Sequence, residues 1–313
     1  MSTVTTLPGP TVQAMEARVV RYADLRPCFN AFIDTRSPGS ETKENFTIIG
    51  PGVSENPDQF VHIAEPHGFN IGGARQPPGC VNSQHSHDTA EVFVVHTGVW
   101  RFDLGEHGDD AQVVARPGDL ISLPTRMFRG FTNIGDDSGY LFAVLGGDDP
   151  GKVLWAPGVF DMAKDYGLVL LESGRLIDTT AGQSVPPDAR TMPRTSAEQA
   201  ALLTKATASG AETLLWRDRA GSGTTAIIGD AGPINWSHSF SVDRIDLDGT
   251  VSDIGVPLRP EVVFVHAGTL TVAWDDGSLN LGAGDTMTLP IGAERRLSGT
   301  ATVYRVSGQP TAG

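Results

Sequence analysis

The stretch of sequence that decides the fold spans residues 79–98 and reads GCVNSQHSHDTAEVFVVHTG. Side chains alternate between the two faces of a β-strand, so His85 and His87 point to the same side. Glu91 opens the next apolar run after a short turn and shares its inward face with Phe93. Two imidazoles and one carboxylate can therefore converge on a single point from two adjacent strands.

This donor set has a characteristic metal preference. Two nitrogen ligands and one oxygen ligand suit iron, manganese, nickel, cobalt or zinc, and suit calcium or magnesium poorly. We predict that His85, His87 and Glu91 bind one divalent transition metal. The alternative is that these residues are relics in a barrel that has lost its metal.

The surrounding sequence indicates a β-rich chain. Short apolar runs such as 119–123 and 140–145 are bounded by Gly, Pro, Asn or Asp, and the 313 residues include 37 Gly and 21 Pro. Short strands with regular turn residues between them are typical of sandwiches and barrels. The sequence predicts a mostly antiparallel, all-β fold.

The later half of the chain repeats the earlier half. EVFVVHTG at 91–98 matches EVVFVHAG at 261–268, and GDLISLP at 118–124 matches GDTMTLP at 284–290. The spacing within the two copies differs only in a hairpin, where insertions cost little. We therefore expect two copies of one β unit rather than a longer array.

The fixed positions of the opening stretch match a known pattern. A glycine, five residues, His-x-His, three residues, a glutamate, six residues and a second glycine follow one another, at Gly79, His85, His87, Glu91 and Gly98. This spacing resembles the first signature of the cupin superfamily. The resemblance implies a bicupin, an all-β chain of two jelly-roll barrels in one chain with a short helical linker region.

The second cupin signature is only partly matched. Gly118, Pro124 and Asn133 stand at its fixed positions, but Arg126 replaces a glycine and Arg129 replaces the histidine that serves as fourth metal ligand. Arg129 has two interpretations. It could anchor a carboxylate, enolate or phenolate of the substrate near the metal. Alternatively it is structural, because the repeat places Arg295 at the same point of the second copy.

The second copy lacks the histidines. Counted back from Glu261, the positions equivalent to His85 and His87 hold Gly255 and Pro257. The second copy is therefore predicted to bind no metal.

The sequence predicts four segments. They are an N-terminal extension that wraps the first barrel (1–60), a metal-binding barrel (61–150), a linker (151–211) and a degenerate barrel without metal (212–313). The linker should contain one short helix over 197–208, which follows a capping box at 195–198.

The resemblance also implies a class of activity. Two-barrel cupins include aromatic-ring dioxygenases and oxalate decarboxylases, and a single active barrel fits the dioxygenases better. We expect an iron(II)-dependent, dioxygenase-like enzyme that acts on a small aromatic or enolisable carbonyl compound, with manganese, nickel, cobalt or zinc as alternative metals. Glu91 and Arg129 are the candidate catalytic residues, and Arg129, Phe93 and Phe131 the candidate substrate contacts. The alternatives are a non-redox metal-dependent lyase, isomerase or hydrolase, and a non-catalytic binding barrel.

The composition of the chain limits the classes of partner that it can bind. The chain has 23 basic and 37 acidic residues and a net charge of −14, which disfavours nucleic acid and anionic membrane surfaces. Residues 1–20 lack the charged head and apolar core of a secretion signal, and no apolar run has the ~18–20 residues of a membrane span. Two cysteines cannot make a disulfide framework. We expect a cytoplasmic protein with a small-molecule substrate, and we allow for a homo-oligomer.

Overall fold

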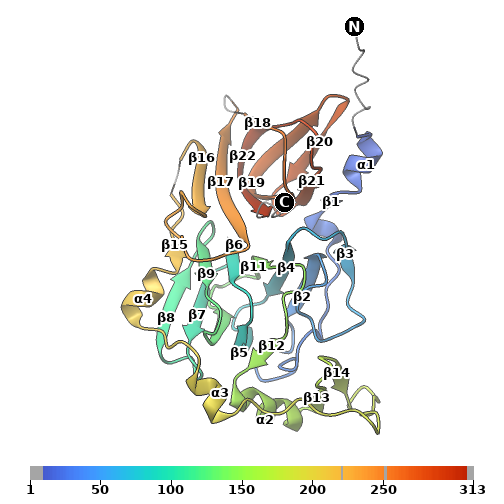
Figure 1. Cartoon of the computed structure of the whole chain (residues 1–313), viewed down its shortest axis with the longest axis vertical. Coiled ribbons are helices and arrows are strands. Elements are labelled where there is room, and N and C mark those ends of the chain that lie inside the picture. The colour runs from blue at the N-terminus through green and yellow to red at the C-terminus, as the bar shows by residue number, and fades with distance from the viewer. Residues whose placement is uncertain (1–9, 220, 250–251, 309–313) are drawn as a thin grey trace. The chain divides into compact units, whose positions relative to one another are not determined.

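The structure, a computed structural model, describes residues 10–219, 221–249 and 252–308 and is built mainly of β-strands (Figure 1). The chain forms two compact units. The first barrel unit comprises residues 26–219 and 236–238. The second barrel unit comprises residues 10–25, 221–235 and 239–308 within the described part. The predicted all-β architecture of two barrels in one chain is confirmed.

The first barrel unit contains two main sheets. One has the strand order β15-β9-β6-β11-β4-β2-β3 and the other β12-β5-β10-β7-β8. The first sheet consists of β2 (Glu44–Ile49), β3 (Val61–Ile63), β4 (Phe69–Gln76), β6 (Glu91–Thr97), β9 (Leu120–Leu123), β11 (Gly139–Gly146) and β15 (Leu215–Trp216). The second consists of β5 (Val81–His87), β7 (Trp100–Leu104), β8 (Ala111–Ala115), β10 (Arg129–Asn133) and β12 (Val153–Trp155).

Period-two alternation builds the core of this unit. Along β7, Trp100, Phe102 and Leu104 are fully buried, whereas the residues between them are half-buried. They pack with Phe93 of β6 in one apolar cluster. Burial of apolar surface is the main force that holds such a barrel together. His85, His87 and Glu91 therefore lie on a scaffold whose stability comes from this core.

A tight turn explains the glycine that ends the opening stretch. Gly98 has a φ of +83° between β6 and β7, a conformation that glycine adopts without strain. A β-carbon at this position would lie 2.7 Å from the Cα of Gly139 on β11. Glycine is therefore required here both by backbone conformation and by close packing.

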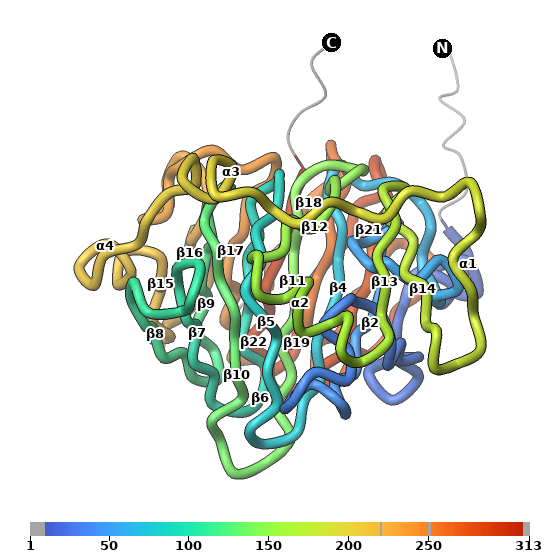
Figure 2. Tube along the Cα trace, turned by 90° about the horizontal axis from the view of Figure 1, so that it is seen from below, coloured from blue at the N-terminus to red at the C-terminus, as the bar shows by residue number. Residues whose placement is uncertain are grey.

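Two helices, α2 (Pro157–Asp165) and α3 (Ala197–Ala201), lie at one end of the first barrel unit together with the hairpin of β13 (Leu168–Leu170) and β14 (Leu176–Asp178) (Figures 1 and 2). A third helix, α4 (Ala208–Glu212), packs beside β8. The helix predicted over 197–208 is shorter than expected and its capping box is formed by Ser196 and Gln199. The helix ends early because the chain turns to pack on the barrel, where Thr204 donates its amide hydrogen to the carbonyl of Arg126.

The second barrel unit is one sheet of eight strands. Its path is β1-β21-β19-β22-β17-β16, with β18 paired to β22 and β20 paired to β19. The elements are α1 (Val12–Glu16), β1 (Val19–Val20), the 3₁₀ turn η1 (Tyr22–Asp24), β16 (Gly223–Ile228), β17 (Phe240–Asp248), β18 (Asp253–Gly255), β19 (Glu261–Trp274), β20 (Gly277–Gly282), β21 (Thr286–Leu289) and β22 (Arg295–Gly308).

The N-terminal segment differs from its prediction. Residues 10–25 belong to the second barrel unit, where Val19 and Val20 pair with Met287 and Thr286 of β21. This pairing covers the edge of β21, whose backbone groups would otherwise lack partners. The rest of the predicted extension, from residue 26, lies in the first barrel unit. None of the described helices is long and apolar enough to cross a membrane.

Candidate metal centre and its pocket

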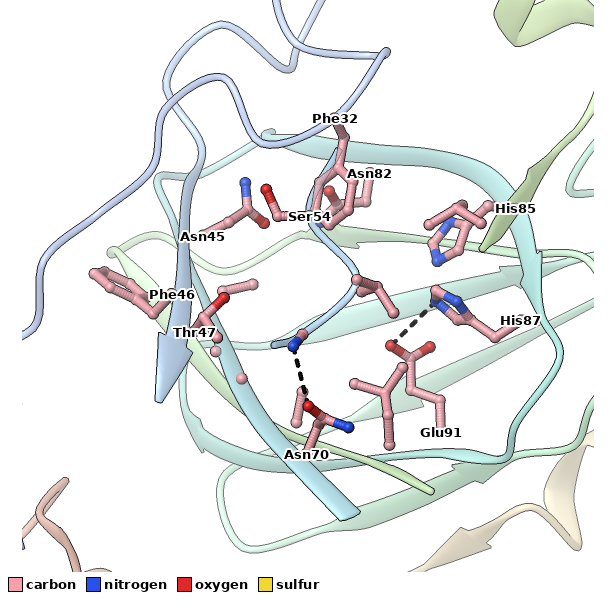
Figure 3. Close-up of a pocket in the computed structure, with 18 of the residues that line it drawn as sticks. Phe32, Asn45, Phe46, Thr47, Ser54, Asn70, Asn82, His85, His87 and Glu91 are labelled. Carbon is pink, nitrogen blue, oxygen red and sulfur yellow. Dashed lines mark hydrogen bonds and ion pairs between the residues drawn. The ribbon is translucent and has the colours of Figure 1, made fainter. Parts of the chain in front are cut away.

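The three predicted ligands come together as the strand pattern indicated. His85 and His87 lie near the end of β5, and Glu91 is the first residue of β6. All three side chains are buried, and one donor atom from each lies within 4.8 Å of the others. His87 Nε2 lies 3.6 Å from Glu91 Oε1 (Figure 3).

The protonation of the two imidazoles suits metal binding. His85 Nδ1 lies 2.7 Å from the carbonyl oxygen of Ser83 and donates to it, which leaves Nε2 with its lone pair. Burial lowers the pKa of His85 to about 3 and that of His87 well below its ordinary value, and the charge of Arg129 acts in the same direction. Both rings are therefore neutral near pH 7, the form that ligates a metal. The donor set fits a divalent transition metal.

Arg129 lies against Glu91 rather than in open space. It starts β10, opposite His85, and its side chain is 0% exposed. Its Nη2 and Nε donate to Glu91 Oε2 at 2.9 and 3.2 Å, and Nη1 donates to the carbonyl of Met127 at 3.1 Å. Burial raises the pKa of Glu91, and the guanidinium opposes that shift. Glu91 thus directs one oxygen to Arg129 and the other to His87.

A largely apolar pocket extends from these ligands. Its volume is about 700 Å³ including the open mouth. Phe93 and Phe131, the candidate substrate contacts, line it together with Phe32, Phe46 and Trp155. Among the described residues that line the pocket, Glu91 is the only one with a charged side chain. Arg129 is not among them, so its predicted contact with substrate stays a prediction, and its observed partner is Glu91.

The residues that form one wall of this pocket were not predicted from the sequence. Residues 45–47 of β2, residues 52–54 of the following loop and Trp155 of β12 contribute to the lining. The Trp155 ring lies 5.3 Å from that of His85, centroid to centroid. No spacing or motif marks these positions, because the segments carrying them reach the site only through strand pairing that is distant in sequence. Cys80, five residues before His85, is buried, and burial raises the pKa of its thiol to about 11.

A buried carboxyl group holds Trp155 in place. Glu55 Oε1 accepts a hydrogen bond from Trp155 Nε1 and Oε2 accepts one from the amide of Ile33, both at 2.7 Å. The carboxyl thereby links the loop around residue 33 to the ring that packs on His85. Burial raises the pKa of Glu55 to about 8.

This shift makes stability depend on pH. Glu55 keeps its proton up to about pH 8 in the folded chain, but an unfolded chain loses it near the ordinary value of 4.5. The folded state binds more protons in that window, so the free energy of unfolding should fall as pH rises from 5 to 8. The loss is a few kcal/mol, at about 1.4 kcal/mol per pKa unit. Denaturant unfolding of wild type and Glu55→Gln at both pH values measures it. In Glu55→Gln, the free energy of unfolding should no longer fall with pH through this group. Glu172→Gln, which changes an exposed carboxyl group, should show the same fall as wild type. An equal pH dependence in all three proteins would contradict the assignment to Glu55.

The second barrel unit repeats the arginine but not the histidines. Gly255 pairs with Arg295 across two strands, as His85 pairs with Arg129. Arg295 Nη2 lies 3.1 Å from Glu261 Oε2, and Nη1 lies 2.7 Å from Asp253 Oδ1. Within the described ranges, His85, His87 and Glu91 are the one group of His, Cys, Asp or Glu residues arranged to hold a metal ion. An arginine–glutamate pair is thus common to both units, and the imidazoles belong to the first alone.

Comparison with known proteins agrees with this architecture. Residues 74–145 match the cupin domain family. Similar solved structures include oxalate decarboxylase from Lactobacillus farciminis in complex with formate (11% identity, TM-score 0.55, 93% of this chain and 86% of that chain covered). They also include vicilin from Capsicum annuum (11%, 0.56, 95% and 87%) and oxalate decarboxylase from Bacillus subtilis (10%, 0.52, 93% and 76%). No curated protein matches significantly.

The domain match and the signature at residues 79–98 place a cupin domain in the first barrel unit. The chain as a whole shares the two-barrel fold of the similar solved structures. Identities near one residue in ten show a shared fold alone, and the similar structures include both an enzyme and vicilin. Its activity must therefore be argued from the site itself.

Proposed function

We propose that the first barrel unit is the active site of a metal-dependent, dioxygenase-like enzyme that acts on a small aromatic or enolisable carbonyl compound, with iron(II) as the metal and O₂ as co-substrate. The observation that supports this most directly is the position of the donor set. His85, His87 and Glu91 lie on the wall of a pocket whose other lining residues are uncharged. Three protein ligands leave coordination positions free for substrate and O₂.

The charge balance of the site favours a substrate that can become an anion. Glu91 and Arg129 neutralise each other, and both imidazoles are neutral. A divalent ion would therefore bring two uncompensated positive charges into a buried site, which is costly unless an anionic group joins it. An enolate or a phenolate supplies such a group. Because the remaining lining is uncharged, the body of the substrate should be uncharged as well.

The residues of this chain have separate tasks in that scheme. His85, His87 and Glu91 would hold the ion, which when bound acidifies an enol or phenol and, as iron, exchanges electrons with O₂. Phe93, Phe131 and Trp155 form apolar walls that would bind the ring and exclude water. Arg129 fixes the orientation of Glu91 through Oε2, so that Oε1 stays directed toward His87.

The test compares turnover with and without oxygen. Full-length protein loaded with iron(II) is offered small phenols and β-diketones, and loss of substrate and consumption of O₂ are both measured. We expect turnover in air and none under anaerobic conditions. Equal turnover without O₂ would instead indicate a non-redox lyase, isomerase or hydrolase. Failure to bind any metal would indicate a non-catalytic barrel.

Glu91 and Glu261 provide a matched pair of variants for the same test. Glu91→Gln keeps the shape of the side chain but removes a negative charge next to the imidazoles, so metal affinity or turnover should fall by at least ~10-fold. Glu261→Gln makes the same change beside Arg295 and should leave both quantities as in wild type. Equal losses from the two variants would contradict the separate roles of the two barrels.

A further inference from the structure

We propose that the side-chain amides of Asn82 and Asn45 bind an uncharged, carbonyl-type oxygen of the substrate in this pocket. The substrate would then carry a second oxygen function besides the one that reaches the metal. This inference rests on the proposed function, since it takes the occupant of the pocket to be the substrate. It adds the class of compound that the pocket selects.

An irregularity in strand pairing turns Asn82 toward the pocket. Arg129 pairs with His85 and Phe131 with Asn82, so two steps along β10 correspond to three steps along β5. Regular alternation would place residues three apart on opposite faces. The extra residue of this β-bulge puts Asn82 on the same side as His85, and both line the pocket. Bulges near functional sites commonly redirect a side chain in this way.

A hydrogen bond from Lys43 sets the orientation of the Asn82 side-chain amide. Asn82 is 5% exposed, and its Oδ1 accepts a hydrogen bond from Lys43 Nζ at 3.2 Å. An ammonium group can only donate, so the oxygen of the amide must face it. The Nδ2 group is then the part of the amide left for the pocket. It is buried and makes no hydrogen bond to any residue that the structure describes.

A second amide lines the same pocket. Asn45 lies on β2, and its Nδ2 also makes no hydrogen bond within the described part of the chain. Figure 3 shows Asn45 and Asn82 on the wall of the pocket away from Glu91. Buried donors nearly always have a partner, and leaving one unpaired costs about 1–3 kcal/mol. Two such donors in one pocket indicate a site for an acceptor atom.

The other pocket amides behave differently. Asn70 accepts from the amide of Gly52 and donates to the carbonyl of Gly147. Gln59 accepts from the hydroxyl of Thr47 and donates to the carbonyl of Pro51. Both hold the loop around residue 52 in place. The donors of Asn82 and Asn45 have no such structural use, which is why we assign them to a ligand.

The local charge indicates that the acceptor is uncharged. Lys43 is fully buried and forms an ion pair with Asp34, which is also fully buried. The two charges cancel, so the surroundings of Asn82 are neutral. A carboxylate bound there would lack a compensating cation, whereas a ketone, ester or amide oxygen would need only the hydrogen bonds. The pocket should therefore favour a carbonyl compound over a carboxylic acid.

Two probes of nearly equal shape test this. Acetophenone carries a carbonyl oxygen where α-methylstyrene carries a methylene group. Their dissociation constants are measured by NMR titration of the full-length protein, with and without added metal. We expect wild type to bind the ketone at least ~10-fold more tightly, because the alkene leaves the buried donors unpaired. The Asn82→Leu variant should show less than ~2-fold preference, and Asn45→Ala should also lose part of it.

A matched control separates the donors from general effects on the pocket. Gln59→Leu removes an amide that lines the same pocket but is already engaged, so it should keep the wild-type preference for the ketone. Asn45→Ala tests the proposal independently should Asn82→Leu fail to fold. Equal affinity of wild type for both probes, binding of neither probe, or an undiminished preference in the folded asparagine variants would overturn the proposal. Failure of the proposed function would show separately, as absent metal binding or oxygen-independent turnover.

Discussion

A His87→Ala protein should lose its bound metal and remain folded. The substitution removes one of three donors, so affinity for a divalent transition metal should fall by about 100-fold or more. Folding should persist because the apolar cluster around Trp100 and Phe102, rather than the ion, holds the barrel together. Elemental analysis by mass spectrometry measures the metal, and a thermal melt of the metal-free proteins measures the fold. Wild type should carry one metal per chain.

His96→Ala is the matched control for this variant. His96 is also a buried histidine of the first barrel unit, but its ring packs near Tyr140 rather than beside Glu91. The control should therefore keep its metal. Two metals per chain in wild type, or none after reconstitution, would contradict the assignment of a single site to His85, His87 and Glu91.

An Arg129→Leu protein should be less stable without metal and should bind metal more tightly. Removing one partner of a buried ion pair leaves Glu91 uncompensated, which typically costs about 3–5 kcal/mol. The same change removes a positive charge beside the ligands, so a divalent ion should bind at least ~10-fold more tightly. Added metal should then restore much of the lost stability. Melting temperatures measured against metal concentration report both effects.

Arg295→Leu separates this effect from a general role of the repeated arginine. Arg295 is likewise buried and paired, with Glu261 and Asp253, so its loss should also lower stability. No imidazole accompanies Glu261 at the equivalent positions, and metal should therefore not rescue this variant. If neither variant responds to metal and both lose similar stability, the arginine–glutamate pair is a purely structural feature of the two barrels.

The parts of the site that were predicted from the sequence depend on short-range geometry. His85, His87 and Glu91 converge because strand alternation over seven residues and one turn fixes their directions. The two barrels could be predicted from the matching stretches at 91–98 and 261–268, because each stretch contains a complete strand and the turn that ends it.

The unpredicted parts depend on partners far away in the chain. Asn82 faces the pocket only because of a bulge against β10, and no residue pattern marks that bulge. Trp155 and Glu55 reach each other across 100 residues. The ion pair of Arg129 with Glu91 could not be predicted without the register of β10 against β5. The second copy contains an arginine and a glutamate at the same positions, and this repeat did indicate that the two residues act together.

The pairing of β1 with β21 also sets the order in which the two barrels can form during synthesis. β1 leaves the ribosome before the whole of the first barrel unit, whereas its partner β21 is made after that unit. Arg21 and Asp285, which form an ion pair in the second barrel unit, are 264 residues apart in sequence. Domains made early generally fold early, so the first barrel unit can complete itself on the nascent chain. Val20, buried in the finished protein, must wait without its partner until β21 has emerged.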